Sequence, residues 1–148
     1  MSRRQKWPLL IVALLTIAGI GFVQYGRLVG NPKVIEEITN NPDGERAAIV
    51  MLLTLPDDRS LPVNYLREGD QVFVGVDGPW WRQFRGPGVP VTMLIRGERL
   101  HGLAEVKLDD AAYVADIFSR LRPSAPTWLP TWLNGRLLVI TLNHQTKE

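Results

Sequence analysis

The fold is decided by residues 61–76, which read Leu61-Pro-Val-Asn-Tyr-Leu-Arg-Glu-Gly-Asp-Gln-Val-Phe-Val-Gly-Val76. The two apolar runs in this stretch, 61–66 and 71–76, have the composition and length of β-strands. Between them, Arg67-Glu68-Gly69-Asp70 has the length and the glycine of a four-residue hairpin loop. The stretch therefore predicts two antiparallel strands that are neighbours in one sheet.

Strand signals of the same kind continue on both sides of this hairpin. Before it, residues 47–55 form an apolar run that ends at Pro56-Asp57-Asp58. After it, residues 89–95 and 100–107 flank Arg96-Gly97-Glu98-Arg99, a second predicted hairpin of the same form. A last strand is expected over 137–142, after the turn pair Asn134-Gly135. The sequence thus predicts about six short strands.

One helix is expected before the last strand. Asp109 or Asp110 can cap it and Pro123 ends it. Its apolar stripe consists of Tyr113, Val114, Ile117, Phe118 and Leu121. Because no helix of crossover length separates the other strands, a parallel sheet is disfavoured. The predicted fold class is mainly β, an antiparallel barrel with one to two helices.

The N-terminus differs from the rest of the chain. Residues 7–26 carry no charge and run from Trp7 to Gly26, which is long enough to cross a bilayer core about 30 Å thick. An uncleaved single-pass anchor is the favoured interpretation, and a cleaved secretory signal is the alternative. Three basic residues precede the span and two, Arg27 and Lys33, follow closely. The positive-inside rule therefore favours a cytoplasmic N-terminus.

These signals divide the chain into five parts. They are a basic tail (1–6), a transmembrane anchor (7–26), a linker with a short helix at 33–38 (27–43), the barrel domain (44–142) and a polar tail (143–148). The turn cluster Asn40-Asn41-Pro42-Asp43-Gly44 marks the boundary between linker and barrel.

Composition excludes several classes of function. The chain has 148 residues, no Cys and two His, so thiol chemistry and a multi-His metal centre are not expected. Its net charge is +2, from 17 basic and 15 acidic residues. The first 26 residues hold three of the basic groups and no acidic one, so residues 27–148 carry 14 basic and 15 acidic groups, a net charge of −1. The domain therefore lacks the basic field of a nucleic-acid binder.

No side chain is expected to act as a catalytic acid, base or nucleophile. His101 falls inside a predicted strand, where a hydrogen-bonded or exposed role is expected, and His144 falls in the polar tail. Three pairs of adjacent acidic residues occur, in the linker, in a turn and at a helix cap: Glu36-Glu37, Asp57-Asp58 and Asp109-Asp110. Each of these positions accounts for its acidic residues without a catalytic role. No metal site is predicted.

The segment after the second strand is the candidate site. Residues 77–88 read Asp77-Gly-Pro-Trp-Trp-Arg-Gln-Phe-Arg-Gly-Pro-Gly88, with two tryptophans, two arginines and a glutamine between glycine and proline turns. Guanidinium groups bind phosphate in a bidentate manner, and indole rings stack on flat heterocycles. This combination suits a planar cofactor with an anionic tail. The alternative is that Trp80 and Trp81 plug one end of the barrel while Arg82 and Arg85 are solvated.

The order of these motifs resembles the flavin-binding split-barrel superfamily, which has the pyridoxamine-phosphate-oxidase-like fold. The likeness lies in the Pro62-x-x-Tyr65 strand, the Gly69-Asp70 hairpin, the aromatic and basic loop, and the strand Gly102-x-Ala104-x-Val106. It covers about residues 44–142 and is nearest to the deazaflavin-dependent nitroreductase group. The resemblance implies a split barrel.

The resemblance also implies a deazaflavin or flavin (FMN) cofactor and a homodimer. A membrane anchor suits a lipid-soluble, small-molecule acceptor such as a quinone, because it holds the site at the interface. The cofactor-binding residues that the resemblance implies are Pro62, Val63 and Asn64 along the ring system, and Asp77, Gly78, Trp80, Trp81, Arg82, Gln83 and Arg85 in the loop. Arg82 and Arg85 would hold phosphate, and Trp80 or Trp81 would cover the ring. The cofactor itself would supply the hydride or electron chemistry.

The sequence departs from this group in two places. Residues 56–60 are acidic and keep Arg59 as their basic residue, and the loop at 77–88 contains no lysine. A membrane-tethered split barrel that binds a ligand or a partner protein without catalysis is therefore the alternative. For that function, Trp128 and Trp132 would form an exposed apolar patch, unless they pack across the barrel mouth.

Overall fold

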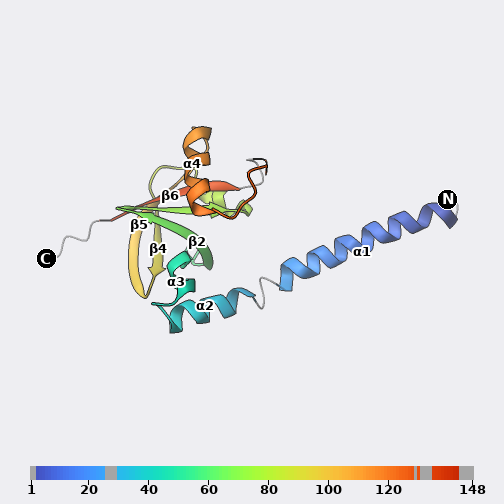
Figure 1. Ribbon diagram of the computed structural model, residues 1–148, viewed down its shortest axis with the longest axis horizontal. Helices are drawn as coiled ribbons and strands as arrows, with labels where there is room; N and C mark the ends of the chain where they lie inside the picture. The colour runs from blue at the N-terminus through green and yellow to red at the C-terminus, as the bar shows by residue number, and fades with distance from the viewer. Residues whose placement is uncertain (1–2, 26–29, 129, 131–134, 144–148) are drawn as a thin grey trace. The chain divides into compact units, whose positions relative to one another are not determined.

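The computed structural model describes residues 3–25, 30–128, 130 and 135–143 (Figure 1). The chain divides into two compact units, residues 1–36 and 37–148. In the first, helix α1 (Arg3–Tyr25) contains 19 residues, Trp7–Tyr25, that are apolar enough to cross a membrane. The described side chains of this stretch are exposed along its whole length. Helix α2 (Asn31–Asn40) follows and is longer than the helix expected at 33–38.

The second unit contains a closed antiparallel barrel, which confirms the predicted fold class. Its strands are β1 (Val50–Thr54), β2 (Ser60–Glu68), β3 (Gln71–Val76), β4 (Val89–Ile95), β5 (Glu98–Lys107) and β6 (Arg136–Leu142). They lie in the order β1-β2-β3-β6-β5-β4, and β4 pairs with β1 to close the barrel. The last strand is therefore inserted between β3 and β5.

Both hairpin turns are tighter than the four residues expected from the sequence. Glu68 pairs with Gln71, and Ile95 pairs with Glu98, so two residues remain in each turn. Arg96 and Gly97 both have positive φ, of 49° and 79°, as a type I′ turn requires. This backbone twist matches that of the flanking strands, which lets the pairing continue closer to the turn.

The expected strand at 47–55 is wrong in its first part. Residues Glu45–Ile49 form a short helix, α3, and the strand begins at Val50. The segment Glu-Arg-Ala-Ala has strong helix propensity and follows a turn, which apolar character alone does not reveal. The Tyr65 hydroxyl donates a hydrogen bond of 3.1 Å to the Ala47 carbonyl and so satisfies one of the carbonyls at the helix end. Burial raises the pKa of this tyrosine.

Inward-facing apolar side chains fill the barrel. The buried set includes Met51, Leu53, Val72, Val74, Met93, Ala104, Leu138 and Ile140. The outer face of β3 and β6 is covered by helix α4 (Ala111–Leu121), whose Ile117 and Phe118 pack against Phe73 and Leu137. No polar side chain is buried among the described residues of the barrel. The described interior is therefore a packed apolar core.

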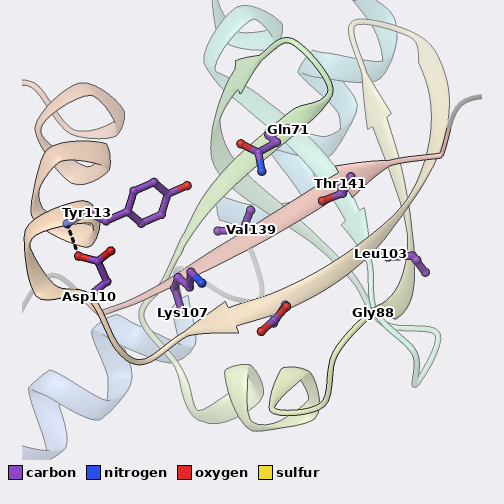
Figure 2. Close-up of a pocket in the computed structure, with 9 residues that line it drawn as sticks. Gln71, Gly88, Leu103, Lys107, Asp110, Tyr113, Val139 and Thr141 are labelled. Atoms are coloured by element: carbon purple, nitrogen blue, oxygen red, sulfur yellow. Dashed lines mark hydrogen bonds between the residues drawn. The ribbon is translucent and has the colours of Figure 1, made fainter.

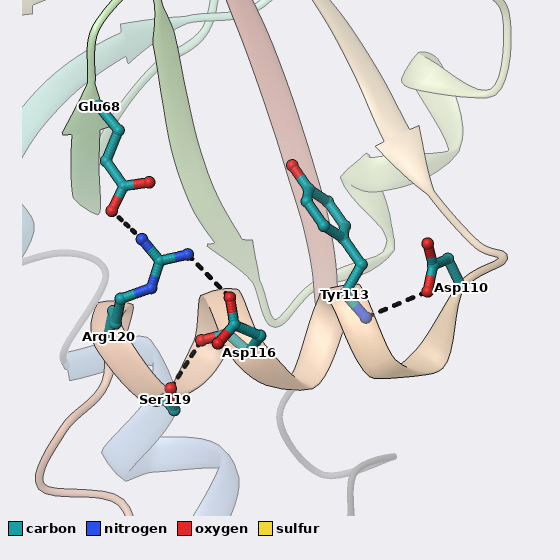
Figure 3. Close-up of polar contacts among 6 residues, drawn as sticks. All are labelled: Glu68, Asp110, Tyr113, Asp116, Ser119 and Arg120. Atoms are coloured by element: carbon teal, nitrogen blue, oxygen red, sulfur yellow. Dashed lines mark hydrogen bonds and ion pairs between the residues drawn. The ribbon is translucent and has the colours of Figure 1, made fainter.

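Helix α4 is fixed at both of its ends (Figure 3). Asp110 is the N-cap, because its carboxylate accepts a hydrogen bond of 3.1 Å from the Tyr113 amide. Near the other end, Arg120 donates to Glu68 of β2 and, at 2.9 Å, to Asp116 of its own helix. Both ion pairs are exposed, so each contributes little to the free energy of folding. The pair with Glu68 joins the end of the helix to strand β2.

Gly102 allows strands β5 and β6 to approach closely. A Cβ atom at this position would lie 2.7 Å from both Ile140 Cγ2 and the Thr141 carbonyl oxygen. We expect Gly102→Ala to lower the free energy of unfolding by about 1–3 kcal/mol, because a packed core resists an added methyl group. Denaturant titration monitored by circular dichroism measures the change. Gly86→Ala is the matched control, since its Cβ would meet no atom within 4 Å; equal stability of both variants would contradict this account.

Candidate functional site at one end of the barrel

The predicted site segment closes one end of the barrel. Residues Pro79–Phe84 form a short 3-10 helix, η2, which joins the end of β3 to the start of β4. Phe84 is 0% exposed and belongs to the barrel core, and Trp80 meets its ring edge-on at a centroid distance of 6.1 Å. Trp80 and Trp81 are half-buried and pack against the same core. Both indoles thus help to close this end of the barrel, which agrees with the alternative given for these two residues in the sequence analysis.

Three guanidinium groups surround the Trp81 ring. The Cζ atoms of Arg82, Arg85 and Arg136 lie 5.8, 5.0 and 5.4 Å from its centroid, within cation–π range. We call these three residues the Trp81 arginine cluster. All three are exposed, and among the described residues no carboxylate forms an ion pair with any of them. The cluster therefore gathers three guanidinium groups around one ring, none of them in an ion pair with a described carboxylate.

Arg136 was not identified from the sequence. It is the first residue of β6 and lies opposite Val76, the last residue of β3, directly before the predicted loop. Its position depends on the pairing of two strands that are far apart along the chain. Only knowledge that β3 pairs with β6 would have placed Arg136 beside the loop.

Two of the predicted site residues are held by contacts within the chain. Asp77 accepts hydrogen bonds from Arg122 Nη2 at 3.1 Å, and Gln83 Nε2 donates to Asp57 Oδ2 at 3.2 Å. Asp57 also forms an ion pair of 2.7 Å with Arg59, whose hydrogen bond lowers the pKa of this carboxyl group. Asp77 and Gln83 therefore fix the loop to the C-cap residue of helix α4 and to the β1–β2 turn.

The strand residues of the predicted site lie on β2, near the same barrel end. Pro62 and Val63 pair with Leu52 and Met51 of β1, and Asn64 pairs with Val50. Pro62 and Val63 are half-buried and Asn64 is exposed. Val63 packs on the same core cluster as Trp80 and Trp81. Gly78 is the N-cap of η2, and a Cβ atom at this position would lie 3.1 Å from the Trp80 indole.

A separate groove lies on the outer face of the barrel (Figure 2). It has a volume of about 680 Å³ and is formed by β3, β5 and β6 with the start of helix α4. Its lining residues are Gln71, Gly88, Leu103, Glu105, Lys107, Asp110, Tyr113, Val139 and Thr141. None of the predicted site residues lines this groove. Sequence reasoning missed it because it depends on how α4 lies across the sheet.

Other candidate side chains take structural positions. His101 is exposed on β5 and lies 3.1 Å from the Thr92 hydroxyl through Nδ1, as expected for a strand residue. Trp128 is 78% exposed, so the expectation that it packs across the barrel mouth is wrong; Trp132 and His144 lie outside the described residues. Within the described part of the chain, no group of three or more acidic or histidine side chains could hold a metal ion.

Comparison with known proteins bears on the fold. No family model matches the chain, and no match was found among curated proteins. Among solved structures, the chain is similar to a "putative pyridoxamine 5'-phosphate oxidase" from Listeria innocua, with a TM-score of 0.51 and 17% sequence identity. The likeness covers 64% of this chain and 83% of that one. At this identity it shows the fold alone: the chain folds as a pyridoxamine-phosphate-oxidase-like split barrel.

Proposed function

We propose that this protein is a membrane-anchored oxidoreductase that uses flavin or deazaflavin and is of the nitroreductase or quinone-reductase type. The observation that carries the proposal is the Trp81 arginine cluster at one end of a split barrel. Exposed guanidinium groups without carboxylate partners suit the phosphate groups of such a cofactor.

In this proposal the chain binds and orients the cofactor. Arg82 and Arg85 hold its phosphate end, Trp80 or Trp81 covers the ring, and the backbone of Pro62, Val63 and Asn64 reaches the polar edge of the ring. Asp77 and Gln83 act by holding the loop in place, since both are bonded within the chain. The cofactor supplies the hydride or electron chemistry when it is bound.

Helix α1 gives the proposal its cellular setting. A single apolar span of 19 residues would hold the barrel at the bilayer surface. That location favours an acceptor that dissolves in the bilayer, such as a quinone. Binding of the cofactor at a subunit interface, and hence a homodimer, belongs to the same proposal.

Cofactor titration tests the proposal. The full-length chain, in detergent micelles, would be titrated with FMN and with deazaflavin while absorbance and fluorescence are recorded. We expect a saturable change at or below tens of micromolar cofactor. A flat titration with both compounds would refute the oxidoreductase function.

The second candidate is a tethered barrel that binds a ligand or a partner protein without catalysis. The outer-face groove favours it, because this groove combines apolar Leu103 and Val139 with polar groups from three strands. Leu103 is 43% exposed, which leaves apolar surface available for a partner. A flat cofactor titration would leave this function as the better one.

A further inference from the structure

The floor of the outer-face groove is built by strand pairing. Val139 of β6 lies opposite Glu105 of β5. Two residues further along β6, Thr141 lies between Gln71 of β3 and Leu103 of β5. Opposite residues in antiparallel strands have Cβ atoms about 5 Å apart on one face of the sheet, so one small molecule can reach all five side chains.

Apolar surface lies among these polar side chains. Tyr113, in the first turn of α4, and Val139 are half-buried and pack against the same apolar cluster. Figure 2 shows Tyr113 projecting from the helix toward the sheet. Leu103, which is 43% exposed, adds further apolar area. A ligand in the groove can therefore bury an apolar group.

Two opposite charges face the groove from one strand. Glu105 and Lys107 are two residues apart on β5, so both face outward, with Cα atoms about 6.6 Å apart. Neither of them forms an ion pair with the other, or with any other residue that the structure describes. The third charged residue of the lining, Asp110, is already engaged as the N-cap of α4. Glu105 and Lys107 are therefore the charges left for a ligand.

A ligand that satisfies both of these residues carries both signs of charge. Glutamate accepts hydrogen bonds from an ammonium group, and lysine donates them to a carboxylate. An α-amino acid holds these two groups on one carbon, and the long side chains of Glu105 and Lys107 can close on them from either side. The groove volume of about 680 Å³ leaves room for a large apolar side chain on the same molecule.

We propose that the outer-face groove binds an α-amino acid with a large apolar side chain. The ligand's ammonium group binds the Glu105 carboxylate, and its carboxylate binds the Lys107 ammonium group. Its side chain packs against Leu103, Val139 and the Tyr113 ring. This inference rests on the second candidate function, ligand binding by the barrel, and is independent of the cofactor chemistry, since none of the predicted cofactor residues lines the groove.

Competition between three matched compounds tests the proposal. Phenylalanine carries both charged groups, hydrocinnamate lacks the ammonium group, and phenethylamine lacks the carboxylate. Isotope-labelled phenylalanine is dialysed to equilibrium against the full-length chain in non-ionic detergent micelles, without cofactor, and the unlabelled compounds are added as competitors; empty micelles give the blank. We expect saturable binding of phenylalanine and a Kd at least about tenfold higher for each of the other two, because each lacks one charge-assisted contact.

Two variants that each remove one charge assign the contacts. Glu105→Gln should weaken binding of phenylalanine and phenethylamine by about tenfold or more, but should not weaken binding of hydrocinnamate. Lys107→Gln should weaken binding of phenylalanine and hydrocinnamate by as much, but not that of phenethylamine. Neither side chain is buried, and a change that only loosened the fold would weaken binding of all three compounds alike.

Glu98→Gln and Arg99→Gln are the matched controls, because they remove charges of the same two signs from the start of β5, outside the groove. We expect both to keep the Kd of phenylalanine within about twofold of the parent chain. No binding of phenylalanine, equal competition by all three compounds, or equal loss in the control and groove variants overturns the inference. The cofactor titration is unaffected by any of these results, and a flat cofactor titration beside selective phenylalanine binding would refute the oxidoreductase function alone.

Discussion

Replacing Phe84 with alanine should lower the free energy of unfolding of the barrel by about 3–5 kcal/mol. Phe84 is 0% exposed and packs among the core residues from the end of the 3-10 helix η2. Its removal would leave a cavity under Trp80, whose ring meets the phenyl edge at 79°. The backbone around this cavity is held by the contact of Gln83 with Asp57 and by the start of β4, so it can relax only in part.

Denaturant titration of the full-length chain in mild detergent, followed by circular dichroism, measures this loss. Trp128→Ala is the comparison variant, because this larger aromatic side chain is 78% exposed. We expect Trp128→Ala to change stability by no more than about 0.5 kcal/mol. A similar small effect for Phe84→Ala would show that the loop does not close the barrel as described.

The second large effect concerns Arg82 and Arg85 in cofactor binding. Changing both to Gln should weaken binding of FMN or deazaflavin by at least about 100-fold, because each hydrogen bond to a charged group contributes about 1.5–3 kcal/mol. Glutamine keeps most of the aliphatic stem, so the loss reports the guanidinium charge. The Kd from fluorescence titration in detergent is the measurement.

The control for this experiment is the double change of Arg67 and Arg99 to Gln at the other end of the barrel. It removes two exposed positive charges without touching the Trp81 ring. We expect its Kd to stay within about twofold of the parent chain, since distant exposed charges are screened by salt. If both double variants bind equally, Arg82 and Arg85 do not hold the phosphate.

Local chemistry made most of the barrel predictable. The positions of β2 through β6 follow from short apolar runs bounded by turn residues, which act within a few residues of one another. Asp110 was identified as a candidate cap for α4 for the same reason. The predicted start of β1 was wrong because apolar residues such as Ala47 and Ile49 occur in both strands and helices. The apolar run is too short for its periodicity to distinguish the two.

The candidate site was predictable only in part. The loop at 77–88 stood out because its aromatic and basic residues are adjacent in the chain. Arg136, Arg122 and Asp57 reach the same barrel end only because the strands close into a ring. The outer-face groove, for its part, exists because α4 covers part of the face that β3, β5 and β6 share.

By itself, the sequence determined the apolar N-terminal helix, the number of strands and the identity of the loop that closes the barrel. Only the tertiary structure decided which arginines surround Trp81, which polar residues of the loop are already bonded, and where the outer surface is hollowed. The physical reason is the range of the interactions. Periodicity, caps and turns act between neighbours in the chain, whereas a binding surface depends on strand pairing and closure between residues far apart in it.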